Sequence, residues 1–343
     1  MAMSKKHVKP SESLIHKTTH LMHDGMDGHA FGEFEMPPAL GDARWTDELI
    51  LSTWYMGATG KVPDHLNYKT GKSDGGFDRL DFKFLGEDEW LDHNKEIDTS
   101  IPLNRRGDER AKLRPPIPIY GGGMSYGSVS VNVMLARAHN AKKWKTYMST
   151  GEGGYPEQLY DLKEHVITQV ATGYFGVEER SIQAAPIVEF KYAQGAKPGL
   201  GGHLLASKAG EEVAKMRGSV PFVSLFSPFP FHSTYSVEDH SKHIDWIQTV
   251  NPNALISVKV STPHDVDMVA VGSHYAGAHI IHLDGGFGGT GAAPEIAKKN
   301  IAMPIELAIP KVHKFLIKEG IRDKVTLIAS GGIRTADDIA KAI

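Results

Sequence analysis

The sequence predicts an α/β fold of the (β/α)8 barrel type, built from parallel strands that alternate with helices. Three observations predict it. From residue 115 onward, short apolar runs rich in β-branched residues recur along the chain. Helical segments fit between most of these runs. Each run ends at glycines or other turn residues, as strands do when they feed a connecting loop.

Seven runs predict strands, whereas a closed barrel has eight. In chain order they are IPIY, KTYMST, HVITQVATG, IVEFKYAQGAKPG, ALISVKVS, AHIIHLDGG and KVTLIASGG. The helices expected between or after them include residues 130–144, 236–250 and 309–320. A last helix should begin in the T-x-x-D pattern of Thr335 and Asp338, which is typical of a helix N-terminus. The sequence stops inside that helix, so we expect the barrel to lack its eighth strand here.

Residues 1–114 are polar and irregular, and they predict an N-terminal extension that packs on the main domain or on a partner. One helix is expected within it, in WTDELILSTWYM, capped by Thr46. The predicted domains are therefore the extension, 1–114, and the barrel, 115–343.

Composition excludes several classes of protein. The chain has no cysteine, which excludes disulfides, thiol catalysis and cysteine-ligated metal by these residues. Its net charge of -3 argues against a nucleic-acid partner, since such proteins usually carry a basic excess. No apolar run is long enough for a membrane span, and the N-terminus lacks the apolar segment of a secretory signal. We expect a cytoplasmic protein.

Two glycine-rich runs lie where a barrel places its reacting groups, directly after strands. The first begins at Asp284 and contains a G-x-G-x-x-G match at Gly286, Gly288 and Gly291. A dinucleotide-binding interpretation is possible, but Glu306 does not end a second strand as that motif requires. The second run, SGGIRT, follows the seventh strand, the position that favours phosphate binding. Its alternative interpretation is an ordinary tight turn.

Two lysines interrupt apolar strands. Lys191 lies in IVEFKY and Lys259 in LISVKVS. A buried ammonium needs a negative partner, and a dianionic substrate or a reduced flavin could supply it. The alternative interpretation is a solvated surface loop, which suits Lys197, in the loop after Lys191, better than it suits Lys191. His240 and His243 are three residues apart on an expected helix, but without a third ligand they indicate a solvated helix face rather than a metal site.

Several motifs together resemble the FMN-binding domain of glutamate synthase, over about residues 115–343. They are PIPIYGGGMSYGSVS, STGEGG, TQVATGYFGV, KYAQGAKPGLGG, TYSVEDHSKHIDWIQTVNPNALISVKV, DGGFGGTGAAP and ASGGIRTADD. The absence of a glutaminase domain makes the chain most similar to the stand-alone barrel subunit of glutamate synthase-like and N-methylglutamate synthase complexes. The resemblance implies an FMN-dependent TIM barrel and reductive amination of 2-oxoglutarate through 2-iminoglutarate. The product would be glutamate or N-methylglutamate.

The resemblance also implies partners and site residues. The partners would be a glutaminase-like or amidotransferase subunit and an electron-donating subunit supplied by NAD(P)H or ferredoxin. An iron–sulfur cluster could come only from residues beyond 343. The implied catalytic residues are Glu152 and Lys197, and the substrate-binding residues are Gln194, Lys197, Arg217 and Ser236. The implied FMN-binding residues are Met124, Ser125, Ser149, Thr150, Gln169, Lys191 and Lys259, with Gly288, Gly289, Gly331, Gly332 and Arg334 at the phosphate.

The sequence departs from the family at Leu200 and His203, which replace more polar residues, and at Phe229 and Phe231. An apolar wall there would suit an N-alkyl group. Other functions stay open. A 2-hydroxy-acid oxidase needs a histidine base at a strand end, to which His282 comes closest, and a nucleotide dehydrogenase needs a cysteine. A non-catalytic scaffold subunit is the remaining alternative.

Overall fold

The computed structural model describes residues 44–63, 76–83, 86, 94–290, 293–298 and 300–343 of the 343. By its internal contacts the chain divides into two compact units, Met1–Lys83 and Phe84–Ile343. The domain boundary expected between residues 114 and 115 stays a prediction. In the first unit, α2 (Asp47–Thr59) begins where the sequence predicts, because the Thr46 hydroxyl accepts a hydrogen bond from the Leu49 amide.

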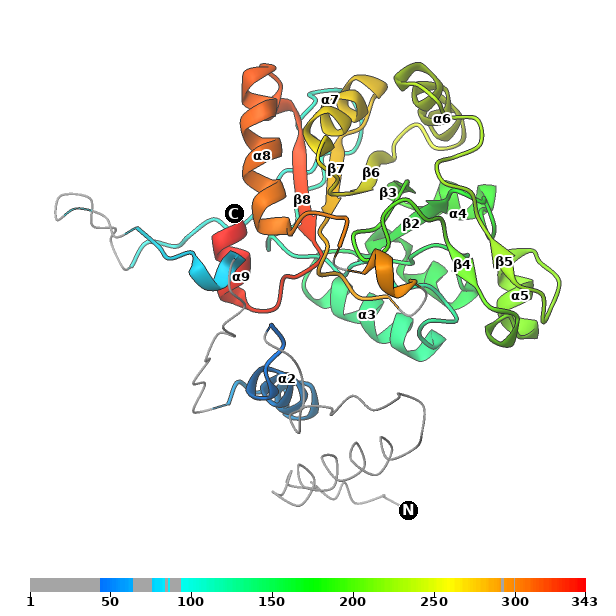
Figure 1. Ribbon diagram of the computed structural model, residues 1–343, viewed down its shortest axis with the longest axis horizontal. Helices are drawn as coiled ribbons and strands as arrows, with labels where there is room; N and C mark the ends of the chain where they lie inside the picture. The colour runs from blue at the N-terminus through cyan, green and yellow to red at the C-terminus, as the bar shows by residue number, and fades with distance from the viewer. Residues whose placement is uncertain (1–43, 64–75, 84–85, 87–93, 291–292, 299) are drawn as a thin grey trace, which may run out of the picture. The chain divides into compact units, whose positions relative to one another are not determined.

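The second unit is built on a parallel sheet of six strands in the order β1-β2-β3-β6-β7-β8, which confirms the predicted α/β architecture (Figure 1). The first predicted run, IPIY, does not form a strand; an isolated parallel bridge joins Gly121, the residue directly after it, to Met148. The other six runs all form strands. Their bounds are β1 Met148–Ser149, β2 Val166–Ala171, β3 Ile187–Lys191, β6 Leu255–Ser261, β7 Ile280–Asp284 and β8 Thr326–Ser330.

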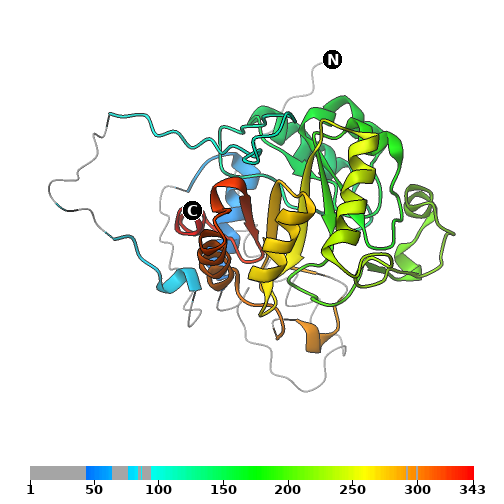
Figure 2. The ribbon, with the colours of Figure 1, turned by 90° about the horizontal axis from the view of Figure 1, so that it is seen from above.

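Helices follow the strands and lie along the outer side of the curved sheet (Figure 2). They are α3 Val131–Lys143, α4 Glu179–Ala184, α6 Val237–Val250, α7 Val266–Ala276, α8 Ile305–Lys318 and α9 Ala336–Ala342, with the 3-10 helix η3 at Glu157–His165. The predicted cap of the last helix is confirmed, since the Thr335 hydroxyl accepts from the Asp338 amide. Between β3 and α6 the chain inserts a two-stranded antiparallel sheet, β4 (His203–Leu204) and β5 (Leu225–Phe226), and α5 (Glu211–Arg217).

The two faces of the sheet differ because side chains alternate along each strand. On the outer face, Val188, Phe190 and Ile256 pack against α4 and α6 in an apolar core. On the inner face, the amino-terminal part of the strands is apolar, with Ile187 and Leu255 in one buried cluster. Further along the same face the residues become polar and charged. The interior of the barrel therefore changes from apolar to charged toward the carboxyl ends of its strands.

The segment 101–113 closes the amino-terminal end of the sheet. Leu103 is buried in the apolar inner cluster, and its amide donates to the carbonyl of Leu113. The hydroxyl of Thr326 on β8 donates to the carbonyls of Pro102, at 2.9 Å, and Leu103, at 3.2 Å. The two ends of this segment are thereby joined to each other, and the segment is joined to the last strand of the sheet.

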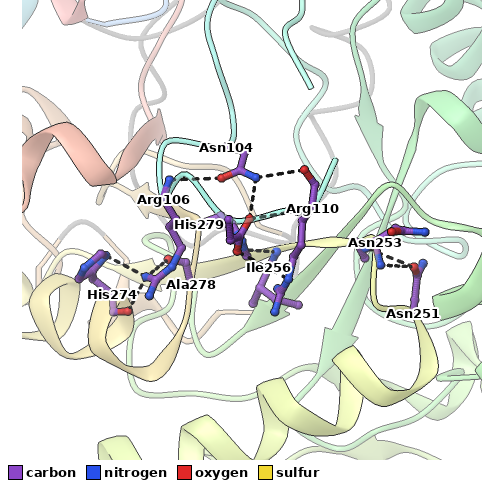
Figure 3. Close-up of polar contacts among 11 residues, drawn as sticks. Asn104, Arg106, Arg110, Asn251, Asn253, Ile256, His274, Ala278 and His279 are labelled. Atoms are coloured by element: carbon purple, nitrogen blue, oxygen red, sulfur yellow. Dashed lines mark hydrogen bonds and ion pairs between the residues drawn. The ribbon is translucent and has the colours of Figure 1, made fainter. Parts of the chain in front are cut away.

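A polar network, which we call the amino-end network, fixes the same segment to the loop between α7 and β7 (Figure 3). It consists of Arg106, Asp108, His274, Ala278 and His279. Arg106 Nη1 donates to His274 Nδ1 at 3.0 Å and to the carbonyls of His274 and Ala278 at 2.8 and 3.1 Å. Asp108 lies 2.9 Å from His279 Nε2.

Among the described residues, no helix is both long and apolar enough to cross a membrane.

Candidate active site

The strand register brings the charged residues of the inner face to one level. Lys191 on β3 pairs with Lys259 on β6, and Lys259 pairs in turn with His282 on β7. Two residues further along β7, Asp284 pairs with Ser330 on β8. Since all these strands are parallel, their carboxyl ends meet at the same edge, where β/α barrels carry their active sites.

Each lysine has a carboxylate partner within the chain. Lys191 Nζ lies 3.0 Å from Glu152 Oε1, and Lys259 Nζ lies 3.5 Å from Asp284 Oδ2. All four side chains are nearly buried. The sequence predicted a substrate or a flavin as the negative partner of these lysines; the structure shows a carboxylate of the same chain beside each, and a contact with flavin or substrate stays a prediction. Burial of each ammonium is offset by a buried carboxylate of the same chain.

A third carboxylate, Glu189, lies deeper in the sheet, and both of its oxygens have hydrogen-bond partners. Its Oε1 accepts from Gln169 Nε2 at 2.7 Å. Its Oε2 accepts from Ser257 Oγ and lies 2.9 Å from His282 Nδ1. The other ring nitrogen of His282 is 2.7 Å from Ser330 Oγ.

The network continues from Ser330 to the ion pair on β6. The Ser330 hydroxyl donates to Asp284 Oδ1 at 2.6 Å, and the Gly195 amide donates to Asp284 Oδ2 at 3.0 Å. Glu189, His282, Ser330, Asp284 and Lys259 thus form one connected chain of polar contacts, which we call the carboxyl-end network.

The electrostatics keep the three carboxylates ionised. Burial alone would raise the pKa of Glu152, but Lys191 next to it, with Lys197 and Arg217, lowers that pKa below its usual value. Burial likewise opposes ionisation of Glu189 and Asp284. His282 and Lys259 nevertheless lower the pKa of both carboxyls.

The pKa values of Lys191 and Lys259 shift in opposite directions. The pKa of Lys191 is lowered, because burial outweighs the attraction of Glu152. Burial also acts to lower the pKa of Lys259, but Asp284 and Glu189 raise it above the ordinary value. Lys259 is therefore protonated and positively charged at neutral pH.

Two further cations, Lys197 and Arg217, are buried near Glu152 without a carboxylate of their own. Their exposed fractions are 3% and 5%. Among the described residues, neither forms an ion pair, although both feel the charge of Glu152. Within the described part of the chain, Arg217 Nε has no hydrogen-bond partner, and Nη2 donates to the carbonyl of Tyr126 at 3.3 Å. The alternative interpretation of Lys197 as part of a solvated surface loop is wrong.

Glycines permit close packing of the loops around these groups. A Cβ on Gly195 would lie 1.9 Å from the Gly285 carbonyl oxygen, and one on Gly331 would lie 2.4 Å from the same oxygen. Three strand-end loops therefore meet backbone to backbone. A Cβ on Gly202 would lie 2.4 Å from Glu152 Oε1, so the inserted segment also presses on the charged site.

The other residues predicted to bind FMN or substrate lie in different surroundings. Gly151 packs against the backbone of Met124 and Ser125, and the buried Ser149 Oγ accepts from the Gly151 amide. Thr150 is also buried, and its hydroxyl donates to the Gly151 carbonyl. Gln194 is half-buried in the loop after Lys191.

The glycines proposed for the phosphate meet on two neighbouring loops, since a Cβ on Gly288 would lie 3.6 Å from Gly331 Cα. Gly332 continues the β8 loop, and Gly289 has open space beside it. Arg334 is differently placed: its Nε and Nη2 donate to the Asp338 carboxylate at 2.9 and 3.1 Å. Its guanidinium thus already has an anionic partner.

Three sequence interpretations change in the structure. His240 does not lie on a solvated helix face, because it is 6% exposed and packs edge-on against Phe190. Phe231 is fully buried against Phe190 and Tyr192 on the outer face of the sheet, so it does not form an apolar wall at the charged site. His203, in contrast, directly follows Gly202, which packs against Glu152, and burial and Lys197 lower the pKa of His203.

The carboxyl-end network was missed from the sequence, although a signal was present. Glu189 interrupts the same apolar strand as Lys191, two residues earlier, and His282 interrupts the next buried strand but one. Charged or polar residues two apart on a buried strand share a face. That spacing could have identified Glu189 as a partner of the site.

The Gly286–Gly291 match does not form a dinucleotide fold. It follows β7, but the chain then runs through the short 3-10 helix η5 (Glu295–Ala297) before α8 begins at Ile305. Gly291 itself lies outside the described residues. A helix directly after the glycines, which that motif requires, is not formed among the described residues.

Comparison with known proteins gives consistent results. A family model described as a conserved region in glutamate synthase matches residues 87–343. The archaeal-type glutamate synthase (NADPH) of Thermotoga maritima is 38% identical over 258 residues, which are 75% of this chain and 50% of that one. The Methanocaldococcus jannaschii archaeal glutamate synthase (NADPH) is 38% identical over 270 residues, 77% of this chain and 51% of that one.

Other matches are more partial. The Bacillus subtilis glutamate synthase (NADPH) large chain is 37% identical over 227 residues, 64% of this chain but 15% of that one. A solved variant of flavocytochrome b2 with benzoylformate superposes with a TM-score of 0.44 at 13% identity, over 72% of this chain and 58% of that one, which supports no conclusion. The chain spans about half the length of the archaeal-type relatives it matches.

Proposed function

The chain belongs to the glutamate synthase family, and we propose that it catalyses the reductive amination step of that chemistry. The substrate would be 2-oxoglutarate, converted through 2-iminoglutarate to glutamate or N-methylglutamate. The cofactor would be FMN, and the chain would act as the synthase subunit of a multi-subunit complex.

The single observation that carries this proposal is the unbalanced charge at the carboxyl ends of the strands. Glu152 and Asp284 offset Lys191 and Lys259, whereas Lys197 and Arg217 are left over. Burying two cations without counter-ions is unfavourable unless an anion joins them. A substrate with two carboxylates supplies both charges. Arg217 suits a bidentate grip, because its Nε has no hydrogen-bond partner among the residues that the structure describes.

The residues present fit a flavin mononucleotide. The inner face offers Ser149, Gln169, Lys191 and Lys259 along adjacent strands, and the glycine loops after β7 and β8 allow a phosphate to approach the backbone. Because Arg334 is held by Asp338, the phosphate would be bound chiefly by backbone amides of Gly288, Gly289, Gly331 and Gly332. When bound, FMN supplies the hydride that reduces the imine carbon.

Glu152 is the group placed to handle the nitrogen of the substrate. It is ionised, since Lys191 keeps its pKa low, so it accepts hydrogen bonds rather than donating a proton. We expect it to accept from the imine or amine N–H and so orient the reacting carbon. Gln194 lies in the loop after Lys191 and would contact the substrate from that side. Ser236 is exposed and caps α6, so its contribution would depend on substrate reaching that helix.

A 2-hydroxy-acid oxidase is less well supported. That reaction needs a histidine that is free to accept a proton, and both ring nitrogens of His282 are already engaged, by Glu189 and Ser330. A non-catalytic scaffold subunit would bind no anionic substrate, so it would not explain the buried charges of Lys197 and Arg217. The flavin absorbance of the purified protein separates the scaffold from the enzyme.

The names of the relatives specify NADPH, which supports an electron route from NAD(P)H, whereas the amine donor is inferred from the proposed reaction. We propose a glutaminase-like or amidotransferase subunit for ammonia and a separate subunit that delivers electrons from NAD(P)H or ferredoxin. His203, beside Lys197, is the residue of this chain most suited to distinguish ammonia from methylamine, because it replaces a more polar family residue.

The test measures steady-state kinetics of the assembled complex with 2-oxoglutarate and either ammonia or methylamine. Lys197→Ala and Arg217→Ala should each lower kcat/KM for 2-oxoglutarate roughly ten- to a hundredfold, the loss expected for about 1.5–3 kcal/mol per charged hydrogen bond. Arg217→Lys should be nearly as harmful, because lysine cannot form the bidentate contact. The matched control is Lys215→Ala, an exposed cation on the same helix.

Unchanged dependence on 2-oxoglutarate in both alanine variants, with flavin still bound, would show that these residues are not the carboxylate clamp. A protein that shows no flavin spectrum even after reconstitution would contradict the FMN assignment itself.

A further inference from the structure

The proposed reaction makes no use of His282, although this side chain lies at the centre of the carboxyl-end network. It is 2% exposed, and the Glu189 carboxylate beside it is 1% exposed. Its two ring nitrogens point to different partners, Glu189 on one side and Ser330 on the other. The protonation state of a buried histidine follows from what each of its nitrogens must do.

The partner of Nδ1 can only accept. Glu189 receives hydrogen bonds from Gln169 and from Ser257, so it is an ionised carboxylate with no proton to give. The contact of 2.9 Å between Glu189 Oε2 and His282 Nδ1 therefore requires a proton on Nδ1. Tyr120 OH lies further from the same nitrogen, at 3.3 Å.

The partner of Nε2 must also accept. Asp284 receives the Gly195 amide and faces the Lys259 ammonium, so it too is ionised. The one hydroxyl proton of Ser330 is donated to Asp284 Oδ1 at 2.6 Å. Toward His282, 2.7 Å away, the Ser330 oxygen can only accept, so Nε2 carries a proton as well.

We propose that His282 is held as an imidazolium cation inside the barrel and that it is a positioning residue for the flavin site. Through Ser330 it orients the Asp284 carboxylate, and Asp284 in turn fixes the ammonium of Lys259. The cation also compensates the Glu189 charge, which would otherwise be a buried anion without a counter-ion. The part that concerns the flavin rests on the proposed function, whereas the charge of His282 does not.

Two other buried histidines provide an internal contrast. His279 Nδ1 accepts from the Ile256 amide at 3.1 Å, so only its Nε2 carries a proton. His274 Nδ1 accepts from Arg106, which likewise excludes a proton there. The same residue type is thus neutral at the amino end of the sheet and charged at the carboxyl end, because the hydrogen-bond partners differ.

The charge is tested on the intact wild-type protein by NMR with 15N-labelled histidine. Long-range proton–nitrogen spectra distinguish an imidazolium, with two protonated nitrogens, from either neutral tautomer. The signal of His282 is identified by its loss in His282→Gln. It should show the imidazolium pattern at pH 7, with a proton on each ring nitrogen. A neutral pattern at pH 7 would overturn the proposal.

The positioning role is tested by redox titration of bound FMN. His282→Gln keeps a donor toward Ser330 but removes the charge, so the flavin potential should fall, since the reduced anion loses a stabilising cation. His279→Gln is the matched control and should leave the potential unchanged. An unchanged potential in His282→Gln with FMN bound would refute the role. Should the wild-type protein bind no FMN, the proposed function fails, and the NMR result alone decides the imidazolium.

Discussion

The amino and carboxyl ends of the sheet both contain a buried polar network with histidine, yet they are arranged oppositely. In the amino-end network, Arg106 contacts two backbone carbonyls and the neutral His274. Asp108 is likewise matched, by His279. In the carboxyl-end region, Lys197 and Arg217 are buried with no ion pair among the described residues.

The difference separates stability from binding. A network whose donors and acceptors are all matched within the chain fixes one arrangement of the backbone, here the segment 101–113 against the α7–β7 loop. A site that leaves cations unmatched is less stable on its own and binds an anion more strongly. Substitutions at the two ends should therefore have opposite effects on stability. Three predictions test this difference, given in order of decreasing expected effect.

Arg106→Ala should cause the largest change, a loss of about 2–4 kcal/mol in the free energy of unfolding, because it leaves two carbonyls and a ring nitrogen without their donor. Chemical denaturation monitored by circular dichroism measures it. Arg105→Ala, the exposed neighbour, should change stability by less than about 0.5 kcal/mol. Equal effects of the two variants would contradict a structural role for the amino-end network.

Lys197→Met should have a smaller effect of opposite sign. Methionine has a similar length but no charge, so it removes a buried ammonium that forms no ion pair with any described residue. We expect the ligand-free protein to gain about 1 kcal/mol of stability while catalysis is lost. Thermal unfolding in the absence of 2-oxoglutarate provides the measurement. A clear loss of stability would mean that Lys197 is compensated within the chain.

The smallest expected effect is on how the stability of the amino end depends on pH. Burial and the nearby Arg106 lower the pKa of His274 from its ordinary 6.5 to about 4. The unfolded chain therefore binds a proton that the folded chain does not, and stability is lost as pH falls from about 6.5 to about 4. His274→Gln should flatten the dependence of stability on pH across this window. A profile as steep as that of the wild type would assign the acid sensitivity to other groups.

Much of the fold could be predicted because strand and helix periodicities are local properties of the sequence. The caps formed by Thr46 and Thr335 were read from spacing alone and are confirmed. The insertion with β4 and β5 could not be predicted in this way, because two-residue strands have no periodicity. The burial of His240 also depends on aromatic partners distant in sequence.

At the site, the sequence identified the unusual lysines but not what neutralises them. Glu152 is 39 positions before Lys191 and comes from a loop, and only the strand register makes them neighbours. Asp284 was noticed as the start of a glycine run rather than as the partner of Lys259. A lysine within an apolar strand pattern indicates a buried charge, whereas the identity of its counter-ion depends on the tertiary structure.

The hydroxyl of Thr326 also constrains how the chain folds. It contacts carbonyls of Pro102 and Leu103 across as many as 224 residues of sequence. During synthesis, the segment around Leu103 leaves the ribosome long before β8 exists, so it cannot make its final contacts until almost all of the sheet has been translated. Such a long sequence separation predicts slow closure of this end, and the apolar Leu103 must stay protected from other chains in the meantime.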